Sequence, residues 1–388
     1  MLSDTTMAYA ENLTGALLGV DALYRHESGD ADGLVVVNMA TGERSERFGS
    51  YQEAASRFRE LGRRAEALPE PDRQLYYAQV CRSTLAFLRW RGGVLPFTEQ
   101  ISEFLHVPAA PASDAELDAL RAEMRGLLSR MGYSGDLGAQ CAAWEARNRV
   151  PPDEVPAVLD ELLDQAWDRT AERIALPDPK SDGMRVQTVS GVPFNARCDY
   201  LARTVELNVD PILTRPALKH LAVHECYPGH YVQFKLRETW YANGEAPADG
   251  LISVVNTASS CTFEGIADNG LRVLDWIEGD DDRLAALMTR YRSGIGTAAA
   301  WRLHQLGWAP EQVTDWLRKN TLVGGEGWVA NRMRFIEAPQ RCALIWSYWW
   351  GEASVGPAWE RVPTERQGDF LRFLYGRMHS PQSVALFS

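Results

Sequence analysis

The chain has 388 residues, of which 45% are hydrophobic and 24% are charged, and its formal net charge is -12. This composition is ordinary for a globular protein, and the acidic balance argues against nucleic acid or an anionic membrane surface as a partner. No stretch reaches about 18 apolar residues, so no membrane span is expected. The first twenty residues include Asp4 and Glu11 but no basic segment, and they do not resemble a signal peptide.

The six cysteines are scattered along the chain, and none forms a Cys-x-x-Cys pair. This spacing argues against a disulfide framework and against a zinc site made of cysteines alone. A reducing compartment fits such cysteine usage. The sequence therefore predicts a cytoplasmic protein.

The N-terminal region is predicted to be mostly helical. Segments 50–68, 113–132 and 154–176 place apolar residues three and four apart, which is the period of a helix with one buried face. Ser113 followed by Glu116 matches a capping box at the start of the second segment. Breaker residues cluster at 176–183 and mark the best internal boundary. The prediction is an N-terminal helical region, 1–180, and a metal-binding catalytic region, 181–388, within one continuous globular unit.

Beyond this boundary the pattern changes. Segments 184–200 and 203–210 are rich in Val and Thr and predict strands. Segment 203–210 could present an edge to a peptide substrate, although an ordinary structural strand explains the same pattern. Thr214 and Pro216 then begin a predicted helix, because a capping residue is followed by proline in the first turn. The remaining chain is predicted to be helical, so the expected fold class is mainly α.

The segment HECYPGH, residues 224–230, is the most informative part of the chain. Zinc hydrolases commonly contain His-Glu-x-x-His, in which two histidines four residues apart share one helical face. Here the second histidine comes six residues after the first, which would separate the rings by roughly 120° around an unbroken helix. Pro228 kinks or ends a helix, and Gly229 adopts backbone angles that other residues avoid. We therefore expect a break before His230 that lets His224 and His230 reach one metal ion.

A third metal ligand is expected in TFEGIADNG, residues 262–270, which is predicted to be helical. Catalytic zinc takes three protein ligands and keeps one position for water. We assign Glu264 as the ligand that joins His224 and His230. Asp268 lies four residues later on the same face, where it can hydrogen-bond the outer nitrogen of a ligand histidine. Zinc is the expected ion, with iron or another divalent metal as the alternative.

Glu225 adjoins His224 and points to a different side of the helix, so it is the expected general base. A bound metal lowers the pKa of its water toward ~7, and a nearby carboxylate can take the proton and pass it to a leaving amine. A His-Glu pair alone is equally typical of a surface helix. The Pro-Gly break and the downstream Glu-x-x-x-Asp favour the metal site.

These residues resemble the bacterial domain-of-unknown-function 885 proteins, in the broad gluzincin-like metallopeptidase group. That family is marked by His-Glu-x-x-Pro-Gly-His-His followed by Gln or Glu, and later by Glu-Gly-Trp-Ala. HECYPGHYVQ keeps this pattern except at Tyr231, and EGIA keeps it except at Ile266. The resemblance covers about residues 185–360. It implies a large, mostly helical metallopeptidase-like fold with a small sheet beside the active-site helix.

A donor for the developing oxyanion is needed in this type of hydrolysis, and Tyr, His and Arg commonly supply it. Tyr348 is the first candidate, because it precedes a Gly-Glu pair and matches a tyrosine of the family. His304 is the second candidate. A core histidine with its hydrogen bonds satisfied is the alternative interpretation of His304.

Substrate contacts are expected from residues near the same segments. Arg332, Arg334 and Arg341 could hold a carboxylate through two parallel hydrogen bonds, although a solvated helix face explains them equally well. Tyr231 could line the site, and a buried packing role is the alternative.

Three functions are compatible with this sequence. The leading hypothesis is a zinc-dependent hydrolase of an amide or peptide-like bond, with a metal-activated water and Glu225 as general base. The second keeps the metal but makes the protein a lyase, cyclase or oxygenase that tailors a small molecule in specialised metabolism. The third is a non-catalytic helical scaffold that binds peptides and keeps a remnant site. The presence of Glu225 beside the ligands argues against this third hypothesis.

Overall fold

The computed structural model describes residues 2–29, 33–40 and 45–387. The chain divides into two compact units, and each is discontinuous in sequence. The first unit contains the N-terminal residues up to 109, residues 232–266 and the residues from 350 onward. The second unit contains residues 110–231 and 267–349. Residues 110–180 therefore lie in the same unit as the HECYPGH motif.

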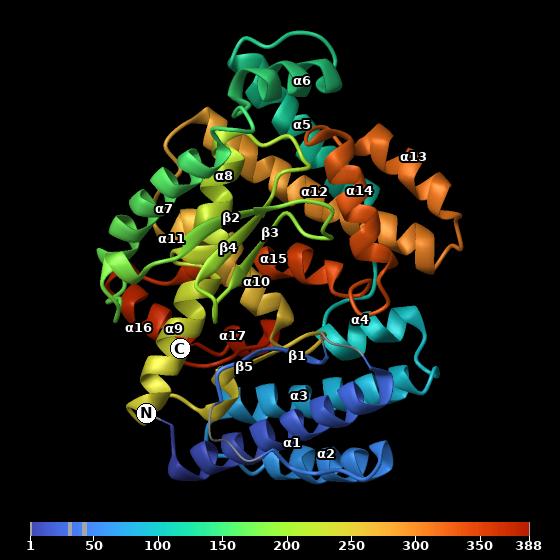
Figure 1. The fold of residues 1–388 in the computed structure, drawn as a ribbon, viewed down its shortest axis with the longest axis vertical. Coiled ribbons are helices and arrows are strands. Elements are labelled where there is room, and N and C mark those ends of the chain that lie inside the picture. Colours follow the sequence, from blue (N-terminus) through green and yellow to red (C-terminus); the bar gives the residue numbers. More distant parts are fainter. Residues whose placement is uncertain (1, 30–32, 41–44, 388) are drawn as a thin grey trace. The chain divides into compact units, whose positions relative to one another are not determined.

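The fold is mainly helical, as the sequence predicted, and the described residues contain two small sheets. In the first unit, β1 (Val35–Asn38) pairs antiparallel with β5 (Ile252–Val254). Helix α2 packs against both α1 and α3, and Figure 1 shows these three helices side by side. The helices that lie wholly or mostly in this unit are α1 (Asp4–Ser28), α2 (Tyr51–Ala65), α3 (Pro71–Arg91), α4 (Phe97–Leu105), α9 (His230–Ala242), α10 (Ser260–Asp268), α15 (Ile345–Arg361), α16 (Gln367–Gly376) and α17 (Pro381–Val384).

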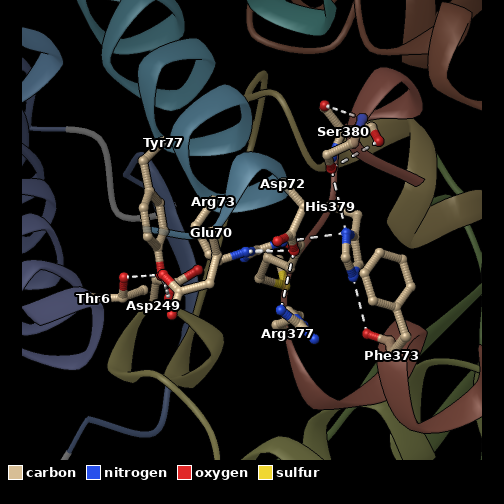
Figure 2. A network of polar contacts seen from close by, with 12 residues as sticks. Thr6, Glu70, Asp72, Arg73, Tyr77, Asp249, Phe373, Arg377, His379 and Ser380 are labelled. Carbon is tan, nitrogen blue, oxygen red and sulfur yellow. Dashed lines mark hydrogen bonds and ion pairs between the residues drawn. The ribbon is translucent and has the colours of Figure 1, made fainter. Parts of the chain in front are cut away.

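A buried polar network joins α3 to the C-terminal tail of the first unit, as Figure 2 shows. Arg73 is fully buried and donates to the Asp72 carboxylate at 2.9 Å and to the Met378 carbonyl at 2.8 Å. Its Nη2 also lies 3.2 Å from Nδ1 of His379, whose Nε2 donates to the Phe373 carbonyl at 2.9 Å. Burial, and then the positive charge of Arg73, lower the pKa of His379 well below its ordinary value. The network therefore requires a neutral imidazole.

We expect acid to destabilise the protein through His379. Because its pKa is lowered in the fold, the unfolded chain binds the proton first, and the free energy of unfolding falls as the pH drops below about 6.5. One such group contributes a loss of about 1.4 kcal/mol per pH unit. Urea unfolding at about pH 7 and about pH 5 should show a weaker pH dependence for His379→Gln than for the wild type.

The control for this measurement is His26→Gln, since His26 is exposed on α1. This variant should keep the pH dependence of the wild type. An unchanged pH dependence in His379→Gln would contradict a buried neutral His379.

The second unit contains a three-stranded sheet with the strand order β2-β4-β3. Strand β4 (Thr204–Asn208) pairs parallel with β2 (Arg185–Val189) and antiparallel with β3 (Ala196–Asp199). The expectation that segment 203–210 offers an edge to a peptide is wrong, because β4 is the central strand and is paired on both sides. The helices that lie wholly in this unit are α5 (Asp114–Arg130), α6 (Leu137–Asn148), α7 (Val155–Ala171), α8 (Arg215–Leu221), α11 (Gly270–Val273), α12 (Asp280–His304), α13 (Pro310–Asn320) and α14 (Gly325–Glu337).

The predicted helix starts in this unit are confirmed. The capping box of α5 is complete, since Ser113 Oγ accepts from the Glu116 amide and the Glu116 carboxylate accepts from the Ser113 amide. Thr214 Oγ1 accepts from the Ala217 amide at 3.3 Å and caps α8, with Pro216 in its first turn. Strand β3 contacts the π-helical turn that follows α8. The small sheet therefore lies beside the helix that carries the motif, as expected.

Candidate metal centre

The helix that carries the motif breaks where the sequence predicted. Helix α8 ends at Leu221, and a π-helical turn covers Ala222–Cys226. Three non-helical residues follow, and α9 begins at His230. Single π-turns inside helices often occur at functional sites. The break places the His224 and His230 rings edge to face, with their centroids 4.7 Å apart.

Gly229 makes this break possible through close backbone contact. Its amide donates to the Val223 carbonyl at 2.9 Å. A Cβ at this position would lie 1.8 Å from the carbonyl oxygen of His224 and 2.4 Å from that of Val223. No side chain fits there, so the backbone itself must approach the turn that carries His224.

Among the described residues, two overlapping groups of side chains each bring three potential ligand atoms within 4.8 Å of one another. The first group is His224, His230 and Glu264, which is the predicted ligand set. The second is His220, His224 and Asp268. His220 was not among the predicted ligands, although its position four residues before His224 places both rings on one helical face. Either group could hold a metal ion.

Asp268 fixes the orientation of His224. Its Oδ1 accepts from Nδ1 of His224 at 2.9 Å and lies 3.5 Å from Nε2 of His220. Burial alone would raise the pKa of Asp268, but the contacts with the two histidines outweigh it and hold this pKa well below its usual range. With its Nδ1 committed to a carboxylate, His224 would bind a metal through Nε2. The predicted contact between Asp268 and a ligand histidine is thus present.

A pocket in the second unit opens beside these residues. The cavity volume is about 160 Å³. A single water molecule needs only ~10–15 Å³ of such volume, so the pocket has room for a small ligand. The polar and charged side chains that line it are Asn195, His220, His224, Glu225, Asp268, Thr289, Arg292, Ser293, Asn331, Arg332 and Tyr348.

The two predicted oxyanion donors lie in different places. Tyr348 lines the pocket, and its ring packs against Phe335 with the centroids 6.2 Å apart. His304 does not line it. It is exposed at the end of α12, and its Nε2 donates to the Ile336 carbonyl at 2.6 Å. The hydrogen-bonded structural interpretation of His304 fits this position.

Of the three arginines predicted near the substrate, only Arg332 lines the pocket. Trp328, Arg332 and Phe335 share one face of α14, whereas Arg334 is exposed on another side. Arg341 lies outside the lining, with its guanidinium carbon 6.0 Å from the centroid of the Phe335 ring.

Arg292 of α12 also lines the pocket, although it was not among the predicted substrate contacts. Its helix carries several other arginines, so its local sequence does not distinguish it. Arg292 differs from these arginines only because the packing of α12 and α14 places it in the pocket lining.

Tyr231 has a structural position rather than a place in the pocket. Its side chain is buried, and its hydroxyl donates to Asp178 and accepts from Arg203, both at 2.9 Å. Burial, and then the Asp178 carboxylate, raise the pKa of Tyr231. The packing interpretation of this residue therefore fits the structure better than contact with a substrate.

Neither a protein-family model nor a curated protein matches this chain. Two solved structures are similar to it in fold. A candidate lipoprotein from Colwellia psychrerythraea aligns with a TM-score of 0.56 and 15% identity, over 87% of this chain and 66% of that one. A candidate lipoprotein of unknown function from Shewanella oneidensis aligns with a TM-score of 0.51 and 14% identity, over 86% of this chain and 70% of that one. This chain thus spans just under two thirds of the length of the first protein.

At such low identity the similarity concerns the fold alone. Within the described ranges, no helix combines the length and the apolar character needed to cross a membrane.

Proposed function

We propose that this chain is a zinc-dependent hydrolase of an amide or peptide-like bond. The proposal depends on one observation, the approach of potential ligand atoms of His224, His230 and Glu264 to within 4.8 Å of one another. Two imidazole nitrogens and one carboxylate oxygen suit zinc and leave a position for water. The buried Glu225 follows His224 in the chain and lines the pocket, as a general base must.

Each nearby side chain has one task in this proposal. A bound zinc would polarise the scissile carbonyl group and the attacking water. Glu225 accepts the proton of that water and delivers it to the leaving amine. Asp268 holds His224 in a single tautomer and orientation. Tyr348 donates a hydrogen bond to the oxyanion that develops on the substrate.

The metal content of purified variants tests this proposal. We expect about one zinc per wild-type chain by mass spectrometry after zinc loading and dialysis. His224→Ala and His230→Ala each remove a ligand, so zinc affinity should fall by more than the roughly 10- to 100-fold lost with an outer-shell partner. His304→Ala is the matched control and should keep its zinc, because His304 lies outside the pocket.

A folded wild-type chain that retains no zinc would contradict the proposal. Full zinc content in His230→Ala would also contradict it. Iron in place of zinc would favour the tailoring enzyme, since two histidines and one carboxylate also serve non-haem iron oxygenases.

A further inference from the structure

Two arginines on neighbouring helices line the pocket, and no described carboxylate forms an ion pair with either of them. Arg292 lies on α12 and Arg332 on α14. The Nε atom of each is buried and makes no hydrogen bond. Within the described ranges, neither arginine takes part in an ion pair or donates a hydrogen bond. The acid that acts electrostatically on Arg292 is Glu145, whose carboxylate accepts from the Gly324 amide at 2.5 Å.

The two guanidinium groups are held beside the same indole ring. Their central carbons lie 4.5 Å (Arg292) and 5.1 Å (Arg332) from the centroid of the Trp328 ring. Stacking on an aromatic face fixes the plane of a guanidinium group and leaves its N–H groups directed outward. Burial lowers the pKa of Arg292 to about 9, with repulsion from Arg332 as the second cause. Burial also lowers the pKa of Arg332, to about 10.

The carboxylates that line the pocket do not balance this charge. Asp268 is hydrogen-bonded to His224, and Glu225 is the proposed base. Half-buried charge without an ion pair is costly, so the arrangement is best explained by an anion that arrives with the ligand.

We propose that Arg292 and Arg332 bind a carboxylate of the substrate. The substrate is then an acidic small molecule or short peptide that carries its carboxylate close to the bond to be broken. The statement that a bond is hydrolysed depends on the proposed hydrolase function. The carboxylate subsite itself is independent of that function. A guanidinium group matches the planar carboxylate through two parallel hydrogen bonds.

The rest of the lining favours a carboxylate over a phosphate and adds a second polar contact. Apolar side chains make up much of the lining that the two arginines share, and a singly charged carboxylate is less costly to desolvate there than a phosphate dianion. Asn331 precedes Arg332 and donates from Nδ2 to Asn195 at 2.7 Å, while its Oδ1 is buried and accepts no hydrogen bond. That oxygen can accept from a substrate N–H. The apolar lining residues include Phe194, Ile212, Leu213, Trp328 and Phe335.

Calorimetric titration with succinate, its neutral analogue succinamide and inorganic phosphate tests the subsite. Zinc-free and zinc-loaded wild type should both bind succinate at least roughly tenfold more tightly than succinamide, because hydrogen bonds between charged partners are the stronger ones. Arg292→Met and Arg332→Met should each weaken succinate binding by roughly tenfold or more. Arg334→Met is the matched control on the same helix and should bind succinate as the wild type does.

The outcomes separate this inference from the proposed function. Equal affinity for succinate and succinamide in the wild type overturns the carboxylate subsite without any variant having to fold. Tight phosphate binding without succinate binding overturns it in favour of a phosphoryl group. Zinc binding without succinate binding removes only the subsite. If the wild type cannot be loaded with zinc but binds succinate through the two arginines, the subsite is supported and the proposed hydrolase function is contradicted.

Discussion

Replacing Glu225 by glutamine should leave zinc binding intact and slow amide hydrolysis by roughly a thousandfold. Glutamine has the size of glutamate, but its amide cannot accept the proton of the attacking water. Because the Glu225 side chain is buried and lines the pocket beside His224, solvent cannot easily replace it as the base. The measurement is the release of primary amine from a panel of N-acyl amino acids and dipeptides, with the zinc content of each preparation determined in parallel.

The matched control for this prediction is Glu337→Gln, an identical change at an exposed position of α14. It should retain both zinc and turnover. If Glu225→Gln keeps its turnover as well as its metal, Glu225 is not the base, and the tailoring hypothesis gains support. If the variant loses its zinc, Glu225 is part of the metal site, and the ligand assignment must change.

Local patterns predicted those features that depend on a few neighbouring residues. Ser113 and Thr214 begin their helices as expected, because capping involves only the next three residues. The break at Gly229 was also predictable, since an unbroken helix cannot bring histidines six residues apart to one ion. Asp268 contacts His224 because α10 is a regular helix that places it one turn after Glu264.

Features that depend on distant parts of the chain were not predictable. Strand β4 became central because β2 and β3 both pair with it, and the Val-rich pattern of 203–210 is the same for an edge strand. Arg334 was expected near the substrate because it lies close in sequence to the segment that contains Tyr348. The helix places Arg332 in the pocket lining instead, because Arg334 lies on another face of α14. The two discontinuous units also depend on contacts between distant parts of the chain, since residues 110–180 belong to the same unit as residues 267–349.

Replacing Gly229 by alanine should abolish tight zinc binding. The added Cβ would lie 1.8 Å from the carbonyl oxygen of His224 and 2.4 Å from both its carbonyl carbon and the carbonyl oxygen of Val223. All three are backbone atoms of the π-turn, so the clash cannot be relieved by a side-chain rotation and must displace the turn that carries His224. Overpacking of this kind typically costs ~1–3 kcal/mol of stability. Misplacement of a reacting group by about 1 Å can cost 100-fold in activity, so we expect zinc affinity to fall by roughly 100-fold or more.

Zinc affinity measured by competition with a chelator, together with urea unfolding, separates the two effects. Gly368→Ala is the matched control, because a Cβ at that position of α16 would meet no atom within 4 Å. It should leave zinc affinity and stability close to those of the wild type. Wild-type zinc affinity in Gly229→Ala would show that the metal does not depend on the bend between His224 and His230. Because His224 belongs to both candidate ligand groups, that result would count against either group as the metal site.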